Sequence, residues 1–388
     1  MFSTIFLHEL KYWLKKPVTY IYAAIFFVLA VFMSASTAGI FDFLTVSAGS
    51  SKIVNSPLGI NGLFSGLTVL VFFLFPSIIG VSVYRDYKSE MHTILYSYPF
   101  TKLNYLFAKF LSSLTVVTLI VLSIGVGMAI GFRLPGTNQE IVGAFNIMSY
   151  LNAYVIFIIP NIFLFGALVF AVVTFTRNIS AGFITVVVLM FIQGLTAGLL
   201  SEEEHRFIAA LVDPFGDAAT NYYARYWTVA EQNELSLPIK EMVIYNRLIW
   251  MMVASTVFAL VYKYFSFSQN ALSFSFKKQK SERATKSNFG GVTRINLPKV
   301  TYDFSFSQNL KATWKFSNID FKYIVKSWPF ISIVLVGLIV TLISLSNVGN
   351  LFGTPTLPVT WKTIRGASNS FALAINIITF LYAGMLVH

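Results

Sequence analysis

The chain has 388 residues, of which 56% are hydrophobic and only 11% are charged, and its mean hydropathy is +0.70. Soluble domains carry about 25% charged residues, so this composition excludes a soluble protein and predicts a polytopic membrane protein. In a soluble protein a formal charge of +12 would suggest binding to nucleic acid. In a membrane protein the positions of the basic residues along the chain are more informative, because they indicate the orientation in the membrane. Cysteine is absent from the sequence, which excludes disulfides and thiolate metal sites.

An amphipathic segment opens the chain and long apolar runs follow it. Residues 2–14 are predicted to form an interfacial helix, with Phe2, Phe6 and Trp13 on one face and Glu9 and Lys11 on the other. Eight later runs are long and apolar enough to cross a hydrocarbon core about 30 Å thick. These predicted spans are residues 17–40, 58–83, 106–131, 150–175, 179–200, 247–264, 329–345 and 371–387. The sequence therefore predicts an all-α polytopic membrane protein with about eight transmembrane helices.

Lysine and arginine mark one side of the membrane. Residues 11–16, 84–109 and 265–328 are rich in basic residues, and the alternation of spans places them on one side together with Arg177. The positive-inside rule makes this side cytoplasmic, so the amino terminus is predicted to lie inside. The segment 201–246 falls on the opposite side and carries eight acidic residues against three basic ones.

A charged island separates the second and third spans. Its helical spacing predicts a short amphipathic helix with one apolar and one charged face. The apolar face carries Tyr84, Tyr87, Met91, Ile94, Leu95 and Tyr98, and the charged face carries Arg85, Asp86, Lys88, Ser89 and Thr93. Pro99 breaks this helix, and a second helix is predicted to start near Thr101, so the two meet at a corner. The alternative is an ordinary basic loop on the membrane surface.

The corner resembles the cytoplasmic loop after the second span of ABC-2 type permeases. This resemblance implies that the corner docks on an ABC ATPase subunit and that the chain lies in the bacterial cytoplasmic (inner) membrane. The residues assigned to coupling are Arg85, Asp86, Lys88, Glu90, Ser97, Pro99 and Lys102. We expect Arg85, Asp86, Lys88 and Glu90 to face a charged groove of the ATPase, while the apolar face holds the helix to the bundle. The resemblance also implies short re-entrant helices before the sixth span.

The opening of the chain recurs after a polar linker. Residues 9–17 match residues 320–329 with one insertion, and residues 80–83 match residues 384–387. The repeat predicts a first permease half at 1–264, a basic cytoplasmic linker at 265–320 without a helical pattern long enough to span the membrane, and a truncated second half at 321–388. The unfinished repeat indicates a fragment of a longer protein. Residues 265–270 and 304–309 both read Phe-Ser-Phe-Ser-Gln-Asn, which predicts two paired strands or a duplication without a role.

The repeat and the stretches 174–180 and 288–294 are most similar to the membrane portion of bacterial ABC permeases fused to an M1-type aminopeptidase. The zinc-peptidase motif His-Glu-x-x-His does not occur in this sequence, because His8-Glu9 is not followed by the second histidine. No phosphate-binding loop occurs either, so ATP is expected on a partner subunit and no cofactor on this chain.

The sequence therefore predicts the permease component of an ABC-2 type exporter, not an enzyme, with a separate ATPase, the lipid bilayer and a second permease half as partners. Nucleic acid is not an expected partner. The alternative is a membrane anchor for a downstream M1-type peptidase, without a transport role, and a channel is a more distant third. Asn161, Gln193 and Asn376 lie within spans and are predicted to hydrogen-bond between helices rather than to bind substrate.

Overall fold

A computed structural model describes residues 1–40, 53–89, 91, 99–199, 203–267 and 305–327, and scattered positions between 330 and 382. Five described helices are long and apolar enough to cross a membrane, namely Pro17–Thr37, Pro57–Lys88, Lys102–Gly131, Ile147–Thr176 and Glu241–Tyr264. In the described part of the chain the only strands are the antiparallel pair β1 (Asn350–Leu351) and β2 (Thr354–Pro355). The predicted fold class, an α-helical polytopic membrane protein, is confirmed.

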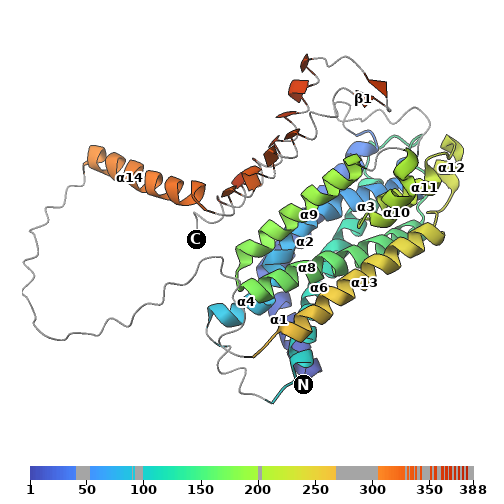
Figure 1. Ribbon diagram of the computed structural model, residues 1–388. Coiled ribbons are helices and arrows are strands. Elements are labelled where there is room, and N and C mark those ends of the chain that lie inside the picture. The colour runs from blue at the N-terminus through green and yellow to red at the C-terminus, as the bar shows by residue number, and fades with distance from the viewer. Residues whose placement is uncertain are drawn as a thin grey trace, which may run out of the picture.

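Figure 1 shows the helices in chain order. They are α1 (Phe2–Lys15), α2 (Pro17–Thr37), α3 (Pro57–Val71), α4 (Val81–Lys88), α6 (Lys102–Gly131), α7 (Ile147–Asn152), α8 (Ile159–Thr176), α9 (Ile179–Leu199), α10 (Arg206–Val212), α11 (Asp217–Ala224), α12 (Val229–Glu234), α13 (Glu241–Tyr264) and α14 (Phe306–Val325).

Capping residues define several of the helix starts. Ser56 and Thr101 accept hydrogen bonds from the third backbone N–H of α3 and α6, so each supplies one of the partners that a helix start lacks. Pro17 occupies the first position of α2, where its missing N–H costs no helical hydrogen bond. The predicted helix start near Thr101 is confirmed.

Two of the membrane-length helices contain irregular turns beside a proline. In Pro57–Lys88, α3 passes through a 3₁₀ turn at Phe72–Leu74 and a π turn at Pro76–Gly80 before it continues as α4. In Ile147–Thr176, a π turn at Ala153–Ile158 connects α7 with α8, just before Pro160. Proline provides no backbone N–H, so the regular ladder must be interrupted there. The separate corner helix predicted to begin at Tyr84 is wrong for its described part, because α4 continues the span and ends at Lys88.

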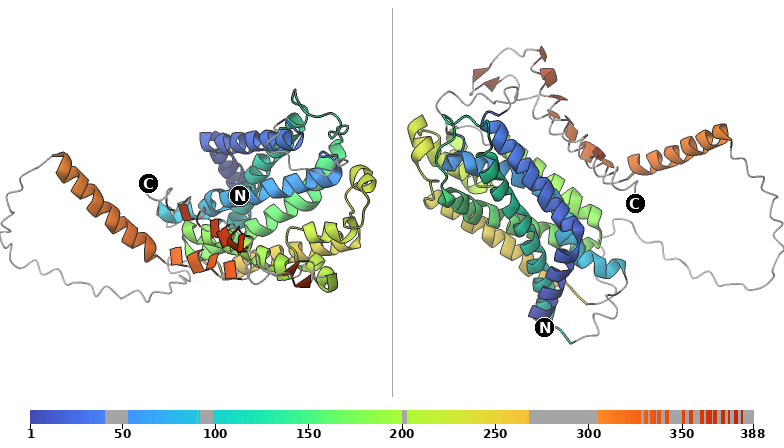
Figure 2. Two further views of the ribbon diagram at one scale, coloured as in Figure 1. Left: turned by 90° about the horizontal axis from the view of Figure 1, so that it is seen from above. Right: turned by 180° about the vertical axis from the view of Figure 1, so that it is seen from behind.

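Within the bundle, α6 packs along α1 and α2, and α8 packs between α13 and α9 (Figures 1 and 2). The core is rich in phenylalanine, and Phe72 stacks on Phe165 with ring centroids 4.4 Å apart. The helices α2 and α6 come so close at Gly127 that a Cβ atom there would lie 2.6 Å from the Phe27 carbonyl oxygen. Only glycine allows this approach.

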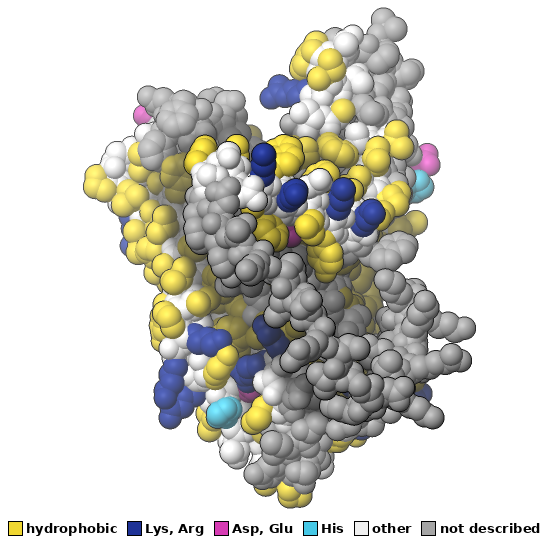
Figure 3. All heavy atoms as spheres, turned by 90° about the vertical axis from the view of Figure 1, so that its left-hand side faces the viewer, with side chains coloured by type: hydrophobic (Ala, Val, Ile, Leu, Met, Phe, Trp, Pro, Cys, Tyr) yellow, Lys and Arg dark blue, Asp and Glu magenta, His cyan; other side chains and the backbone are white. Residues whose placement is uncertain are grey.

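The predicted basic regions meet at one end of the bundle. The Arg177 guanidinium lies 4.2 Å from the centroid of the Tyr87 ring, which joins the end of α8 to α4. Phe265, just after α13, stacks on Tyr105 near the start of α6. The amino terminus lies at the same end, where basic side chains also gather on the face shown in Figure 3. This end is called the basic end below. Its assignment to the cytoplasm stays a prediction.

The opposite end carries the short helices α10, α11 and α12 before α13 (Figure 1). Short helices before the sixth span agree with what the family resemblance implies, although their re-entrant character stays a prediction. The fifth predicted span corresponds to α9, within which Ile179–Met190 is a shorter apolar helix. Only scattered positions of the seventh and eighth predicted spans are described, and both spans stay predictions.

The end of the predicted linker is helical, and α14 is not among the helices of the described chain that could cross a membrane. Helix α14 covers residues 306–325, and Ser305 caps it by accepting from the Gln308 N–H. The strand predicted at 304–309 is therefore a helix start, because Ser305 satisfies a backbone donor there. No residue of α14 is buried, and Figure 3 shows its lysines in a row among hydrophobic side chains.

Candidate functional site

Four charged side chains form a buried cluster at the basic end, called the ion cluster below. The Lys109 ammonium on α6 lies 2.9 Å from Glu9 Oε1 on α1 and 2.8 Å from Asp86 Oδ2 on α4. Arg85 completes the cluster, with its Nη2 2.7 Å from the same Glu9 oxygen. Lys109 also donates to the Ser82 carbonyl oxygen, and the Tyr105 hydroxyl donates to Asp86.

The ion cluster is electrically balanced, because two carboxylates face two cations. Glu9, Asp86 and Lys109 are 3%, 7% and 2% exposed. A buried ion costs several kcal/mol of desolvation, which its partners offset only when every charge is paired and hydrogen-bonded. The cluster therefore fixes α1, α4 and α6 to one another, since moving one helix would separate buried charges.

The predicted exposure of Arg85 and Asp86 is wrong. Asp86 is buried against Lys109 and Tyr105, and the Arg85 side chain is 26% exposed and pairs with Glu9. The side of α4 that packs inward carries Ser82, Val83 and Asp86. Asp86 can lie there because Lys109, from another helix, supplies the opposite charge.

The other predicted coupling residues have different surroundings. Lys88 and Pro99 are exposed, and Lys102 is half-buried, with its ammonium 5.8 Å from the Tyr262 ring centroid. Met91 is 50% exposed and so lies outside the buried core, and its predicted role in holding the helix to the bundle stays a prediction. Glu90, Ser97, Ile94 and Leu95 lie outside the described residues, and their roles stay predictions.

Sequence reasoning missed Glu9 as a member of this cluster. It assigned Glu9 to the polar face of the first helix, yet Glu9 follows Phe2 by two turns and so lies on the same face as Phe2 and Trp13. Trp13 is 4% exposed and Phe2 contacts Phe107 of α6, which confirms that this face packs inward. The signal was present in the spacing, because a carboxylate on an apolar face requires a buried cation.

A second buried charge lies toward the opposite end, at Arg247 in α13. Its Nη1 donates to Asn161 Oδ1 at 2.9 Å, its Nε donates to Asn246 Oδ1 at 3.0 Å, and its Nη2 donates to the Pro214 carbonyl oxygen. Asn161 in turn donates to the Phe215 carbonyl oxygen. The predicted helix-to-helix hydrogen bond of Asn161 is confirmed, and Asn376 lies outside the described residues.

Arg247 and its partners hold the turn before α11 against the bundle. Asp213 accepts from the Phe215 and Ala218 N–H groups, and Gln193 Nε2 donates to Asp213 Oδ1 at 2.7 Å. Gly216 has a φ of 84° at the helix start, which favours glycine. Gln193 therefore binds a turn rather than a neighbouring span, which differs from its predicted role.

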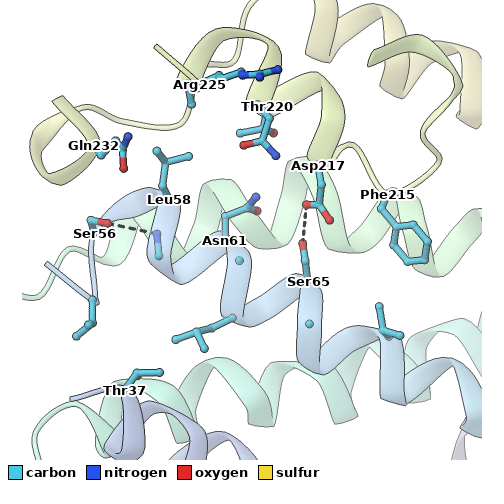
Figure 4. A pocket seen from close by; sticks show the side chains of 18 of the residues that line it. Thr37, Ser56, Leu58, Asn61, Ser65, Phe215, Asp217, Thr220, Arg225 and Gln232 are labelled. Carbon is cyan, nitrogen blue, oxygen red and sulfur yellow. Dashed lines mark hydrogen bonds between the residues drawn. The ribbon is translucent and has the colours of Figure 1, made fainter. Parts of the chain in front are cut away.

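A cleft of about 1010 Å³ opens between α3 and the helices α11 and α12 (Figure 4). Asn61 and Ser65 rise from α3 on the side that faces α11, and the Ser65 hydroxyl donates to Asp217 Oδ1 at 3.3 Å. Apolar side chains such as Leu58, Met190 and Phe215 complete the walls. We call this hollow the α3–α11 cleft. Its size is within the range of small-molecule sites.

The acidic group of the cleft has a raised pKa. Burial, and then the nearby charge of Asp213, raise the pKa of Asp217 to about 6, while Ser65 and Arg247 act in the opposite direction. A carboxyl group whose pKa is higher in the folded chain than in the unfolded chain destabilises the fold at high pH. This cost disappears as the pH falls through about 6 toward 4, because the folded chain takes up the proton first.

Replacing Asp217 with asparagine should remove this cost and keep an acceptor for Ser65. We expect the Asp217→Asn protein to be more stable than the parent at pH 8, by about 2 to 3 kcal/mol. The difference should shrink toward pH 5. Denaturant unfolding in micelles at the two pH values measures this, with Glu234→Gln, at an exposed site, as the matched control. If the variant and the parent differed in unfolding free energy by the same amount at both pH values, the raised pKa of Asp217 would be contradicted.

The membrane-length helices, with a buried ion cluster at one end and a cleft toward the other, are those of an α-helical polytopic membrane protein. Residues 58–212, from α3 through α10, match the profile of a family described as ABC-2 family transporter protein. This match supports an ABC-2 type permease, and it includes α4 and the corner. No curated protein matches the chain.

Proposed function

We propose that this chain is the membrane-spanning permease component of an ABC-2 type exporter, driven by ATP hydrolysis on a separate nucleotide-binding subunit. The observation that carries the proposal is the family match over residues 58–212, because it covers α4 and α6 on both sides of the corner. The bundle supports it with five membrane-length helices. Export rather than import rests on the sequence resemblance alone.

The ion cluster suits the transmission of movement from an ATPase. The exposed residue Lys88 ends α4 and the exposed residue Pro99 lies just before α6, whereas Asp86 and Lys109 tie these helices together from inside. A force applied at the corner would therefore move α1, α4 and α6 together, since the buried charges resist separation. In this proposal Lys88, Glu90, Ser97, Pro99 and Lys102 form the docking surface.

Arg85 and Asp86 then have a positioning role and do not contact the ATPase directly. Arg85 also lies over the Tyr12 ring of α1, with its guanidinium carbon 3.9 Å from the ring centroid. In this position the Arg85 cation stabilises the contact between α4 and α1 in two ways, by its interaction with the Tyr12 ring and by its ion pair with Glu9. The two residues set the angle at which α4 leaves the bundle.

Reversing an exposed corner charge tests the docking surface. We expect Lys88→Glu to lower co-purification of the nucleotide-binding subunit from mild detergent severalfold, because exposed charges mainly govern encounter and specificity. Yield and membrane insertion should not change. Lys240→Glu is the matched control, since Lys240 is an exposed lysine at the other end of the bundle. Equal recovery of the ATPase with Lys88→Glu and the parent would remove Lys88 from the docking surface.

The proposal places the chain in the bacterial cytoplasmic membrane with the basic end inside. Because the sequence has no cysteine, a single introduced cysteine is a unique label. We expect a maleimide that cannot cross membranes to label Lys240→Cys in intact cells, and to label Lys88→Cys only after the membrane is opened. The reverse pattern would contradict this orientation.

The proposal includes a second permease half on the same chain, as in permeases fused to an M1-type aminopeptidase. Helix α14 supports the second half, because its residues 320–325 match residues 9–14 of α1 and both helices end shortly before a proline. Asp320 takes the place of Glu9 in this repeat. Sequencing the parent gene tests the arrangement, which predicts a second corner and a peptidase motif downstream.

A further inference from the structure

The α3–α11 cleft contains a buried polar group without a partner. Asn61 is 4% exposed, its side chain lines the cleft, and its Oδ1 has no hydrogen-bond partner in the described part of the chain. An unsatisfied buried acceptor costs about 1 to 3 kcal/mol, so such an atom needs an explanation. A ligand with a hydrogen-bond donor would provide one.

Two further acceptors lie among the polar groups that line this cleft. Gln193 lines the cleft, and its Oε1 is buried without a partner in the described chain, because its Nε2 is turned toward Asp213. The Asp217 carboxylate faces Asn61 from α11 (Figure 4). Ser65 donates its only proton to Asp217. The walls thus offer two amide oxygens and one carboxylate to a donor.

We infer that the α3–α11 cleft binds a small organic cation with a primary amine. The ammonium group would donate to Asn61 Oδ1, Gln193 Oε1 and the Asp217 carboxylate. Its three N–H donors match these three acceptors. The apolar body would lie against Leu58, Val69 and Phe215, which line the same cleft. This inference concerns binding alone and does not depend on the proposed transport.

A primary ammonium explains the cleft better than an anion. An anion would face the carboxylate of Asp217 and two amide oxygens, and like charges repel. Arg225 is the one Lys or Arg among the described residues that line the cleft. A bound cation would also stabilise the ionised form of Asp217. The charged groups around Asp217 are Asp213, which precedes α11, Arg247 on α13 and Arg225 at the cleft wall.

A matched pair of ligands tests the inference on the unmodified protein. The first is protonated 2-phenylethylamine, and the second is its N,N,N-trimethyl derivative, which has the same charge and ring but no N–H donor. Binding is measured by equilibrium dialysis with the full chain in lipid nanodiscs, after subtraction of binding to empty discs. We expect the trimethyl compound to bind at least about tenfold more weakly, because it lacks the charge-assisted hydrogen bonds.

Three variants locate the site. Asn61→Leu and Asp217→Asn should each weaken binding of the primary amine about tenfold or more, since each removes an acceptor or a charge. Thr68→Val is the matched control. Thr68 is on the same helix, is 1% exposed and has an unpartnered hydroxyl, but it is not among the residues that line the cleft. The Thr68→Val protein should bind the amine with the same affinity as the parent protein.

Several results would overturn the inference. One is the absence of saturable binding of 2-phenylethylamine to the parent protein, and another is equal affinity for the trimethyl compound. Parent-like binding by Asn61→Leu would also overturn it, as would an equal loss with Thr68→Val. If Asn61→Leu fails to fold, the ligand pair on the parent protein and the Asp217→Asn variant still decide the question.

Discussion

Replacing Lys109 with methionine is expected to destabilise the bundle by about 3 to 5 kcal/mol, because it leaves two buried carboxylates with one cation. Glu9 and Asp86 are 3% and 7% exposed, so water cannot take the place of the lost ammonium. The Ser82 carbonyl oxygen also loses its 2.6 Å hydrogen bond from Lys109. Denaturant unfolding in mixed micelles measures the loss.

Lys102→Met is the matched control for this prediction, because Lys102 lies on the same helix but is only half-buried. It should change the unfolding free energy by less than about 1 kcal/mol. The double variant Glu9→Leu with Lys109→Met should recover part of the loss, since one cation (Arg85) and one carboxylate (Asp86) then remain and the net charge of the cluster is again zero. An unchanged unfolding free energy for Lys109→Met would show that the ion cluster does not hold the three helices together.

The second large effect is expected at Arg247. Arg247→Met removes the donor to Asn161, Asn246 and the Pro214 carbonyl oxygen, and we expect a loss of about 3 kcal/mol or more. Arg247→Lys should lose less, because it keeps the charge but not the planar fork of donors. If both variants unfold like the parent, the turn before α11 must be held by other contacts.

Arg247 also connects this stability to the cleft. Its charge acts against the raised pKa of the Asp217 carboxyl, so its removal should raise that pKa further. The stability of Arg247→Met should therefore depend more steeply on pH than that of the parent above about pH 6. The pH dependence of unfolding separates this electrostatic effect from a simple loss of packing.

The fold class could be predicted from the sequence because it depends on composition and run length, which are local properties. The five long helices lie within or around predicted spans, and the start of α6 follows from Thr101 and Pro99. Asn161 was also predicted correctly, since a lone amide in a span needs a partner on another helix.

The surroundings of the charges could not be predicted in the same way. Periodicity places Asp86 opposite the aromatic side chains of its segment, which usually indicates a solvent-exposed face. The buried position depends on Lys109 and Tyr105, which belong to α6. Glu9 depends on Lys109, which lies 100 residues further along the chain. Such pairs come from the packing of helices, and a single helical wheel does not contain that information.

The α3–α11 cleft shows the same limit. Asn61, Gln193 and Asp217 come from three separate helices or their connections, and no spacing in the sequence links them. The sequence predicted a helix-to-helix hydrogen bond for Gln193 and no role for Asn61. The turn before α11, which includes Asp213 and Gly216, places α11 over α3. This placement brings the three acceptors into the α3–α11 cleft.

Site-specific cross-linking tests the central claim, that an ATPase docks at the basic end. A cysteine introduced at Lys88 or at Lys240 is the only one in the chain, so a cross-link reports a single position. We predict that Lys88→Cys cross-links in membranes to a protein with a phosphate-binding loop, and that Lys240→Cys does not. Absence of that product from Lys88→Cys, or an equal yield from Lys240→Cys, would contradict the account.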